Sequence, residues 1–175
     1  MRHFLANLAT YAIAVLLFLG AVTFAWLRSS QVLVTDERSV VAQYEPGAGE
    51  EFRWEALGAG SYVRNCANCH GSAGEGWDQY PGLDRAAALF LAPGGREHLV
   101  DLHLYGLASP RWRAPMPPMG HLGDVETAAV INYVLTHFGN TVPADAFLRP
   151  EDVAARRGLG LAPPEVERGR PGGGG

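Results

Sequence analysis

Both cysteines of the 175-residue chain lie in one short stretch, NCANCHGSAGEG, which runs from Asn65 to Gly76. Cys66 and Cys69 are three positions apart, and His70 follows the second cysteine directly. Two thiols at this spacing can form a disulfide, act as a redox dithiol or bind a metal ion. The adjacent imidazole adds a further possibility, because it can ligate the iron of a haem that the two thiols attach covalently.

Three of these uses are disfavoured by the rest of the sequence. A structural zinc site needs four ligands, and the other histidines form no second ligand pair; they are His3, His98, His103, His121 and His137. A redox dithiol is expected within a βαβ pattern, which is missing, and a plain disulfide leaves His70 without a role. The motif therefore favours one covalently attached haem c, with both thiols on the vinyl groups and His70 as an axial iron ligand.

The elements that must position this motif are helices. Apolar residues recur at helical spacing from Glu51 to Asn65, from Arg96 to Tyr105, and from Asp124, as N-cap, to a stop at Gly139. No strand-like alternation competes with them. The connecting loops are long and rich in Gly and Pro, and the predicted core is small. A domain of this kind needs something besides secondary structure to hold it, such as a cofactor.

From about Trp54 to Asn140 the chain resembles the class I cytochrome c family. The resemblance rests on Gly58 and Tyr62, CANCHGSAGEG, Pro81-Gly82-Leu83, Tyr105-Gly106, MPPMGHLGD and AAVINYVLTHFGN. It implies an all-α cytochrome c fold, with three main helices around covalently bound haem c. It also implies that Gly58 and Tyr62 pack the first helix against the last, at Val130 and Tyr133, where a glycine permits a close approach.

The same resemblance implies a methionine as the sixth iron ligand. It places this ligand at Met116, in the loop RAPMPPMGHLG before the last helix. Met119 is the second candidate and His121 the third. The prolines around Met116 stiffen the loop, so that the sulfur atom needs little rearrangement when the iron changes oxidation state.

Residues around the ligands are also implied by the resemblance. The carbonyl of Pro81 is expected to accept the Nδ1 proton of His70 and so to orient the ring. Arg111, Trp112 and Arg113 are candidates to donate hydrogen bonds to the haem propionates, with a solvated loop as the alternative for the two arginines. The histidines of the last two helices are interpreted as surface or boundary residues; they are His98, His103 and His137.

The N-terminal region carries a different signal. Phe4 to Leu27 contains no charged residue and is about 36 Å long as a helix, at roughly 1.5 Å per residue. We interpret residues 1–28 as a retained transmembrane anchor, the alternative being a cleaved signal peptide. Residues 29–49 are expected to form a linker, 50–148 the cytochrome c domain, and 149–175 a disordered tail rich in Gly, Pro and Arg.

A haem iron with two protein ligands has no open site for substrate, which favours one-electron exchange over enzymatic catalysis. We therefore predict a membrane-anchored monohaem cytochrome c that carries electrons between respiratory-chain complexes. One alternative is a fixed subunit of a quinol-oxidising cytochrome bc-type complex or terminal oxidase, and another is a haem-based sensor with a displaceable methionine. The net charge of −4 argues against a nucleic-acid partner. The family places the haem domain on the non-cytoplasmic side of a bacterial cytoplasmic membrane.

Overall fold

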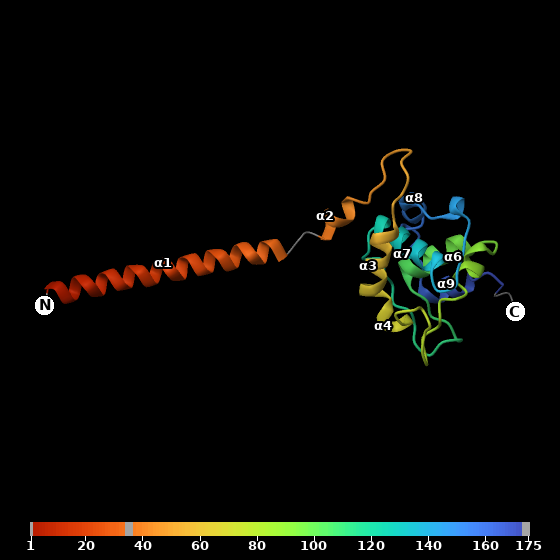
Figure 1. The fold of residues 1–175 in the computed structure, drawn as a ribbon. Helices are drawn as coiled ribbons and strands as arrows, with labels where there is room; N and C mark the ends of the chain where they lie inside the picture. Colours follow the sequence, from red (N-terminus) through yellow and green to blue (C-terminus); the bar gives the residue numbers. More distant parts are fainter. Residues whose placement is uncertain (1, 34–36, 173–175) are drawn as a thin grey trace. The chain divides into compact units, whose positions relative to one another are not determined.

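A computed structural model describes residues 2–33 and 37–172 of the chain. Their regular secondary structure is helical, and they contain no strands. They divide into two compact units, residues 1–42 and the chain from Gln43 onward (Figure 1). The first unit holds α1 (Arg2–Leu33) and α2 (Glu37–Ala42). The second holds α3 (Glu55–Asn65), α4 (Ala67–His70), α5 (Ala86–Leu91), α6 (Gly95–Tyr105), α7 (Asp124–Thr136), a 3₁₀ turn (Ala144–Ala146), α8 (Pro150–Ala154) and α9 (Pro163–Arg168).

Helix α1 contains an apolar stretch, Thr10–Leu27, that is long enough to cross a membrane. None of these residues is buried against protein, and the Thr23 hydroxyl satisfies its hydrogen-bonding capacity within the helix, on the Leu19 carbonyl at 2.9 Å. The helix continues past the expected boundary at residue 28 to Leu33. The expected linker 29–49 therefore includes helical residues and α2, and its residues 34–36 lie outside the described chain.

The crossing of α3 and α7 forms the core of the second unit. A Cβ atom on Gly58 would lie 2.4 Å from the carbonyl oxygen of Ala129, so only glycine lets the two helices approach this closely. One turn further along, the buried Tyr62 packs on Val130, and its ring centroid is 5.6 Å from that of Tyr133. The contact predicted from the sequence is confirmed.

The ends of α7 differ slightly from the prediction. Gly123 is the N-cap, so the assignment of Asp124 as N-cap was wrong, and Asp124 is the first helical residue. Its carboxylate still lies where the helix dipole favours a negative charge, and it accepts a hydrogen bond from Arg157 at 2.6 Å. The helix ends at Thr136, and Gly139 follows in a left-handed conformation with φ +81°.

Helix α5 was not predicted, because its six residues are too few to show a helical period. A buried side chain holds it in place. Asn140 accepts a hydrogen bond from the Ala87 amide at 3.0 Å and donates to the carbonyls of Leu83, at 2.7 Å, and Val134, at 3.0 Å. The end of α7 and the start of α5 are thereby fixed to the loop that follows the cysteine motif.

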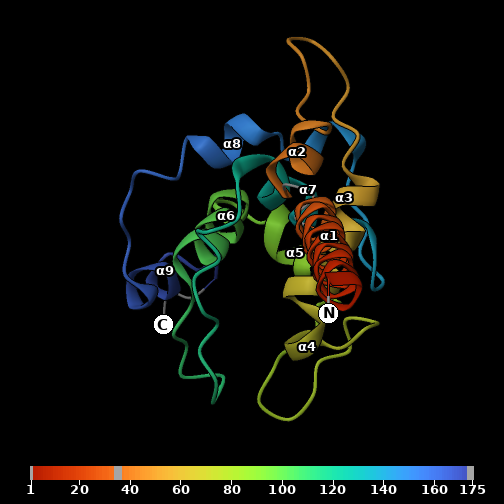
Figure 2. The ribbon, with the colours of Figure 1, turned by 90° about the vertical axis from the view of Figure 1, so that its left-hand side faces the viewer.

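The prediction of a disordered tail from residue 149 was wrong for the part that the structure describes, which ends at residue 172. Helix α8 packs on α7 and helix α9 on α6 (Figures 1 and 2). Each helix is short but buries one valine completely or nearly so, Val153 at 0% and Val166 at 2% exposure. Each also begins with proline, and the backbone amide of its N-cap residue donates a hydrogen bond to an acidic side chain in the first turn. These features stabilise a helix that buries few apolar residues.

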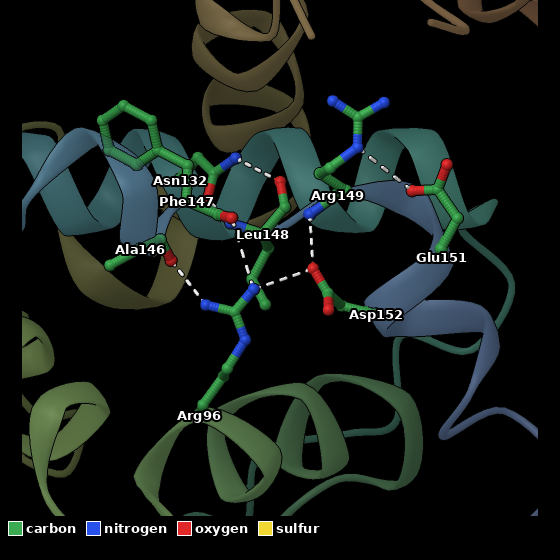
Figure 3. Close-up of polar contacts among 8 residues, drawn as sticks. All are labelled: Arg96, Asn132, Ala146, Phe147, Leu148, Arg149, Glu151 and Asp152. Atoms are coloured by element: carbon green, nitrogen blue, oxygen red, sulfur yellow. Dashed lines mark hydrogen bonds and ion pairs between the residues drawn. The ribbon is translucent and has the colours of Figure 1, made fainter. Parts of the chain in front are cut away.

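The start of this C-terminal segment is joined to the core by buried polar contacts, shown in Figure 3. Asn132 of α7 exchanges two hydrogen bonds of 2.8 Å with the backbone of Leu148. Arg96 of α6 donates to the Ala146 carbonyl at 2.5 Å and to the Asp152 carboxylate at 2.8 Å. The composition of the tail, which lacks aromatic residues, could not predict these contacts, because their partners lie on helices far away in the chain.

Candidate functional site

The cysteine motif forms the junction of two helices. Cys66 is the C-cap of α3 and the N-cap of α4, and its carbonyl accepts the amides of Cys69 at 3.1 Å and of His70 at 2.9 Å. Both cysteines are half-buried and free, with no disulfide between them. Burial raises the pKa of the Cys66 thiol to about 11, and the neighbouring Cys69 adds to the shift, so this thiol is protonated at neutral pH.

The His70 ring has the orientation expected of an iron ligand. Its Nδ1 lies 2.9 Å from the carbonyl oxygen of Pro81, as predicted from the sequence. A carbonyl oxygen only accepts hydrogen bonds, so Nδ1 carries a proton, and in the neutral ring Nε2 has the free lone pair. The local backbone supports this contact, since the Gly76 amide donates to the His70 carbonyl at 2.8 Å. A Cβ on Gly76 would lie 2.5 Å from the carbonyl carbon of Pro81, which explains the glycine there.

The methionine loop between α6 and α7 is held by backbone hydrogen bonds. Met116 and Leu107 exchange two of these bonds, at 2.9 and 3.0 Å, and the Met119 amide donates to the His103 carbonyl at 2.7 Å. Both methionines are half-buried and line the same cavity as His70. His121 is exposed and does not line it.

This cavity has a volume of about 500 Å³, within the range of cofactor sites. Residues of the loop after α4 and of the methionine loop both line it. The two loops project at the same end of the second unit (Figure 2). Most of the cavity wall is apolar; the large aliphatic side chains in it are those of Leu83, Leu89, Leu99, Leu102, Leu107, Ile131 and Val134. Both thiols, the imidazole and both thioethers lie in the remaining wall. This donor set in an apolar cavity fits a flat, apolar macrocycle with a central iron.

The other predicted site residues divide into two groups. Pro81 lines the cavity and contacts His70, and the exposed residues Arg111 and Trp112 also line it. Arg113 is exposed and is not part of the wall. Of the three residues predicted to donate to the haem propionates, Arg111 and Trp112 therefore lie at the cavity and Arg113 does not.

Two histidines of α6 were wrongly interpreted as surface or boundary residues. His98 is 3% and His103 8% exposed, because α6 packs against α5, α7 and α9. His103 lines the cavity, and its Nδ1 lies 2.9 Å from the Leu99 carbonyl. Burial lowers the pKa of His103 to about 4, so the ring is neutral at pH 7. His137, the C-cap of α7, is exposed, as predicted, and its ring is stacked 3.9 Å from that of Tyr133.

A further residue of the wall was missed because it lies in the segment expected to be disordered. Arg170, two residues beyond the end of α9, lines the cavity together with Arg111. Its side chain is only 15% exposed. The sequence contains no local signal for this position, since the contacts that bring Arg170 to the cavity are made by residues far away in the chain.

Comparisons with known proteins agree with this site. The sequence model of a family described as "Cytochrome c" matches residues 55–138. Two curated relatives are both called cytochrome c-552 and come from Thermus thermophilus, the second from a named strain of that species. Each is 34% identical to this chain over 122 residues, which cover 64% of the chain. The aligned part covers 92% of the first relative and 82% of the second.

Proposed function

Because the chain belongs to the cytochrome c family, we propose that it is a membrane-anchored monohaem cytochrome c that carries single electrons between complexes of a respiratory chain. Family membership itself implies covalently bound haem c, an electron-carrying role and redox protein partners. The membrane anchor, the partner complexes and the individual ligands are the finer parts of the proposal.

The observation that carries the proposal is the convergence of five donor side chains on one apolar cavity. Cys66 and Cys69 would hold the porphyrin as thioethers, and His70 would ligate the iron through Nε2. Met116 would be the sixth ligand, with Met119 as the less favoured candidate. The group supplies one-electron exchange between ferric and ferrous iron when it is bound. The protein contributes the apolar cavity, the imidazole oriented by the Pro81 carbonyl and the loop that carries the two methionines.

The backbone contacts of Met116 support an electron carrier more than a sensor. A sensor must release one ligand to admit a small molecule, which is easier from a mobile segment. The backbone of Met116 is instead paired with Leu107 through two hydrogen bonds. Gly106 reinforces this pairing, because a Cβ there would lie 2.7 Å from the Met116 carbonyl oxygen. A rigid loop keeps the ligand sphere the same in both oxidation states and so favours fast electron exchange.

The proposed anchor is α1. Its exposed apolar stretch, Thr10–Leu27, matches the thickness of a bilayer, and Trp26 lies where an interfacial aromatic residue is favoured. We place the haem unit on the non-cytoplasmic side of a bacterial cytoplasmic membrane, since covalent haem attachment in this family takes place there. One helix of this kind is also compatible with a signal sequence, so the size of the mature protein in membranes decides between the two.

The experiment that tests the function is spectroscopy on protein produced in cells with haem c maturation. We expect haem staining to persist on a denaturing gel, one electron to be taken up per chain in a redox titration, and the reduced protein not to bind carbon monoxide. Absence of covalent haem would contradict the family-based function. Rapid binding of carbon monoxide would favour the sensor, because it requires an open iron site.

A further inference from the structure

The C-terminal segment brings one cation to the cavity from well outside the residues that the family model matches, which end at residue 138. Helix α9 packs on α6 through the buried Val166. The Glu167 carboxylate accepts a hydrogen bond from the Ser109 hydroxyl at 2.9 Å, which joins the segment to the start of the methionine loop. Arg170 lies three residues after this attachment point.

Glu167 also fixes the guanidinium of Arg170. The Nε of Arg170 donates to the second carboxylate oxygen of Glu167 at 3.1 Å, and the two side chains are only 15% and 16% exposed. Within the described residues, no group accepts a hydrogen bond from the two Nη nitrogens of Arg170. Since this side chain lines the cavity, its remaining donors are available to a group bound there.

The charge of the cavity wall favours an anionic group at this position. The charged side chains of the wall are those of Asp84, Arg85, Arg111 and Arg170, and Asp84 and Arg85 are exposed to solvent. Glu167, outside the wall, compensates one of the positive charges. A largely buried guanidinium whose donors are only partly used is costly unless a second anion completes its environment. A haem carries two propionate carboxylates, which supply such anions.

We propose that Arg170 is a positioning residue of the haem site, where it pairs with a propionate and raises the reduction potential of the iron. Glu167 sets the geometry, because its hydrogen bond to Nε leaves the Nη pair free for a carboxylate. A cation paired with a propionate would favour the ferrous state, because that state carries one positive charge fewer than the ferric state. The inference rests on the proposed function, since it requires haem in this cavity.

The test compares the reduction potentials of four holoprotein variants. We expect Arg170→Gln and Arg170→Met to have a lower potential than the wild type, with the methionine–iron absorbance band unchanged. Arg170→Met retains the apolar part of the side chain, so it serves if Arg170→Gln folds poorly. Arg170→Lys retains the charge and should recover most of the potential. Arg168→Gln is the matched control: this arginine is on the same short segment, its side chain is 70% exposed, and the potential should not change.

Two results would overturn the role of Arg170. One is an unchanged potential in both neutral variants when covalent haem and the methionine band are intact. The other is an equal decrease in Arg168→Gln, which would indicate a general effect of surface charge. A wild-type protein without covalent haem would instead contradict the proposed function, so the two failures are distinguishable. Unfolding in denaturant, measured on the same variants, separates loss of packing from loss of charge.

Discussion

Cys66 and Cys69 are the residues whose removal tests covalent attachment most directly. Each thiol is expected to form one thioether, so Cys66→Ala or Cys69→Ala should leave at most one bond and little stable holoprotein. The measurement is haem staining after a denaturing gel, together with the yield of folded protein. Ser72→Ala, at an exposed position in the same stretch, is the control. Normal haem yield from a protein lacking both cysteines would contradict attachment at this motif.

Met116 and Met119 compete for the sixth position, because both line the cavity. We expect Met116→Ala to abolish the methionine–iron absorbance band and to lower the reduction potential, since a thioether stabilises ferrous iron. Met119→Ala should leave both nearly unchanged. The two variants are matched controls for each other, as they differ by three positions in one loop. If their phenotypes are exchanged, Met119 is the ligand.

The buried His98 makes the stability of the protein depend on pH. Burial is the main cause that lowers its pKa below the ordinary value near 6.5. Of the charged groups around it, Arg170 lowers the pKa further, whereas Glu167 and Asp101 act in the opposite direction. Because the unfolded chain binds this proton more readily, the stabilisation from the neutral ring is present above pH 6.5. It is lost as the pH falls through the lower folded-state value.

We therefore expect the free energy of unfolding to fall between pH 7.5 and pH 5.5, and His98→Gln to reduce this decrease. The measurement is denaturant unfolding of the holoprotein at both pH values, comparing the difference for each variant rather than its absolute stability. His137→Gln removes an exposed imidazole instead, and it should retain the wild-type difference. An unchanged decrease in His98→Gln would show that other groups cause the pH dependence.

At the scale of elements, the crossing of α3 and α7 is the contact on which the cavity depends. A methyl group at Gly58 would overlap the Ala129 carbonyl, with 2.4 Å between the atoms, so Gly58→Ala must separate two main helices. We expect a loss of about 1–3 kcal/mol in the free energy of unfolding, the usual range for an overpacked core. Chemical denaturation followed by haem absorbance measures it.

Gly158→Ala provides the control for this prediction. A Cβ at Gly158 meets no atom within 4 Å, so the same chemical change should alter stability by less than about 0.5 kcal/mol. Equal effects of the two substitutions would mean that the close approach of α3 and α7 is not what requires glycine at position 58.

The three main helices could be predicted from the sequence because each shows its own apolar period. The predicted start of the first helix was wrong, since α3 begins at Glu55 and not at Glu51. Helix α6 was expected from Arg96 to Tyr105 and runs from Gly95 to Tyr105. The short helices could not be predicted in this way. Helix α8 depends on Asn132 and Arg96, 16 or more residues from its contacts, and a pattern within five residues cannot reveal such partners.

The same distinction applies to the site. The spacing of Cys66, Cys69 and His70 indicates their chemistry directly, because covalent attachment requires these residue types close together in the chain. The Pro81 contact was also predicted, on the basis of family resemblance. The buried His103 and Arg170 were not, since a polar residue on a helix or in a Gly-rich tail is typical of a surface. Only the packing of α6, α7 and α9 reveals that these positions face inward.

For the whole molecule, charge constrains the kind of redox partner. From Gln43 to Gly172 the chain has eleven arginines and sixteen acidic residues, a balance of −5 before haem propionates are counted. The C-terminal segment adds five arginines and four acids to this unit, so its inclusion makes the unit slightly less acidic. An acidic unit of this kind favours a basic or largely apolar docking surface, and association steered by charge should weaken with salt.

The orientation of the chain in the membrane is the last prediction. Haem attachment in this family is confined to the non-cytoplasmic side, and α1 is the one candidate span among the described residues. The haem unit, which follows α1, must then lie outside and Met1 inside. Arg2 and the amino terminus agree with this orientation, because cationic groups are favoured at the cytoplasmic end of a span.

We expect protease added to right-side-out membranes to remove the haem-stained domain and to leave only a short N-terminal fragment that contains α1. A cytoplasmic marker enzyme that survives the same treatment is the control, and haem-stained protein that resists protease until the membrane is broken would reverse the topology.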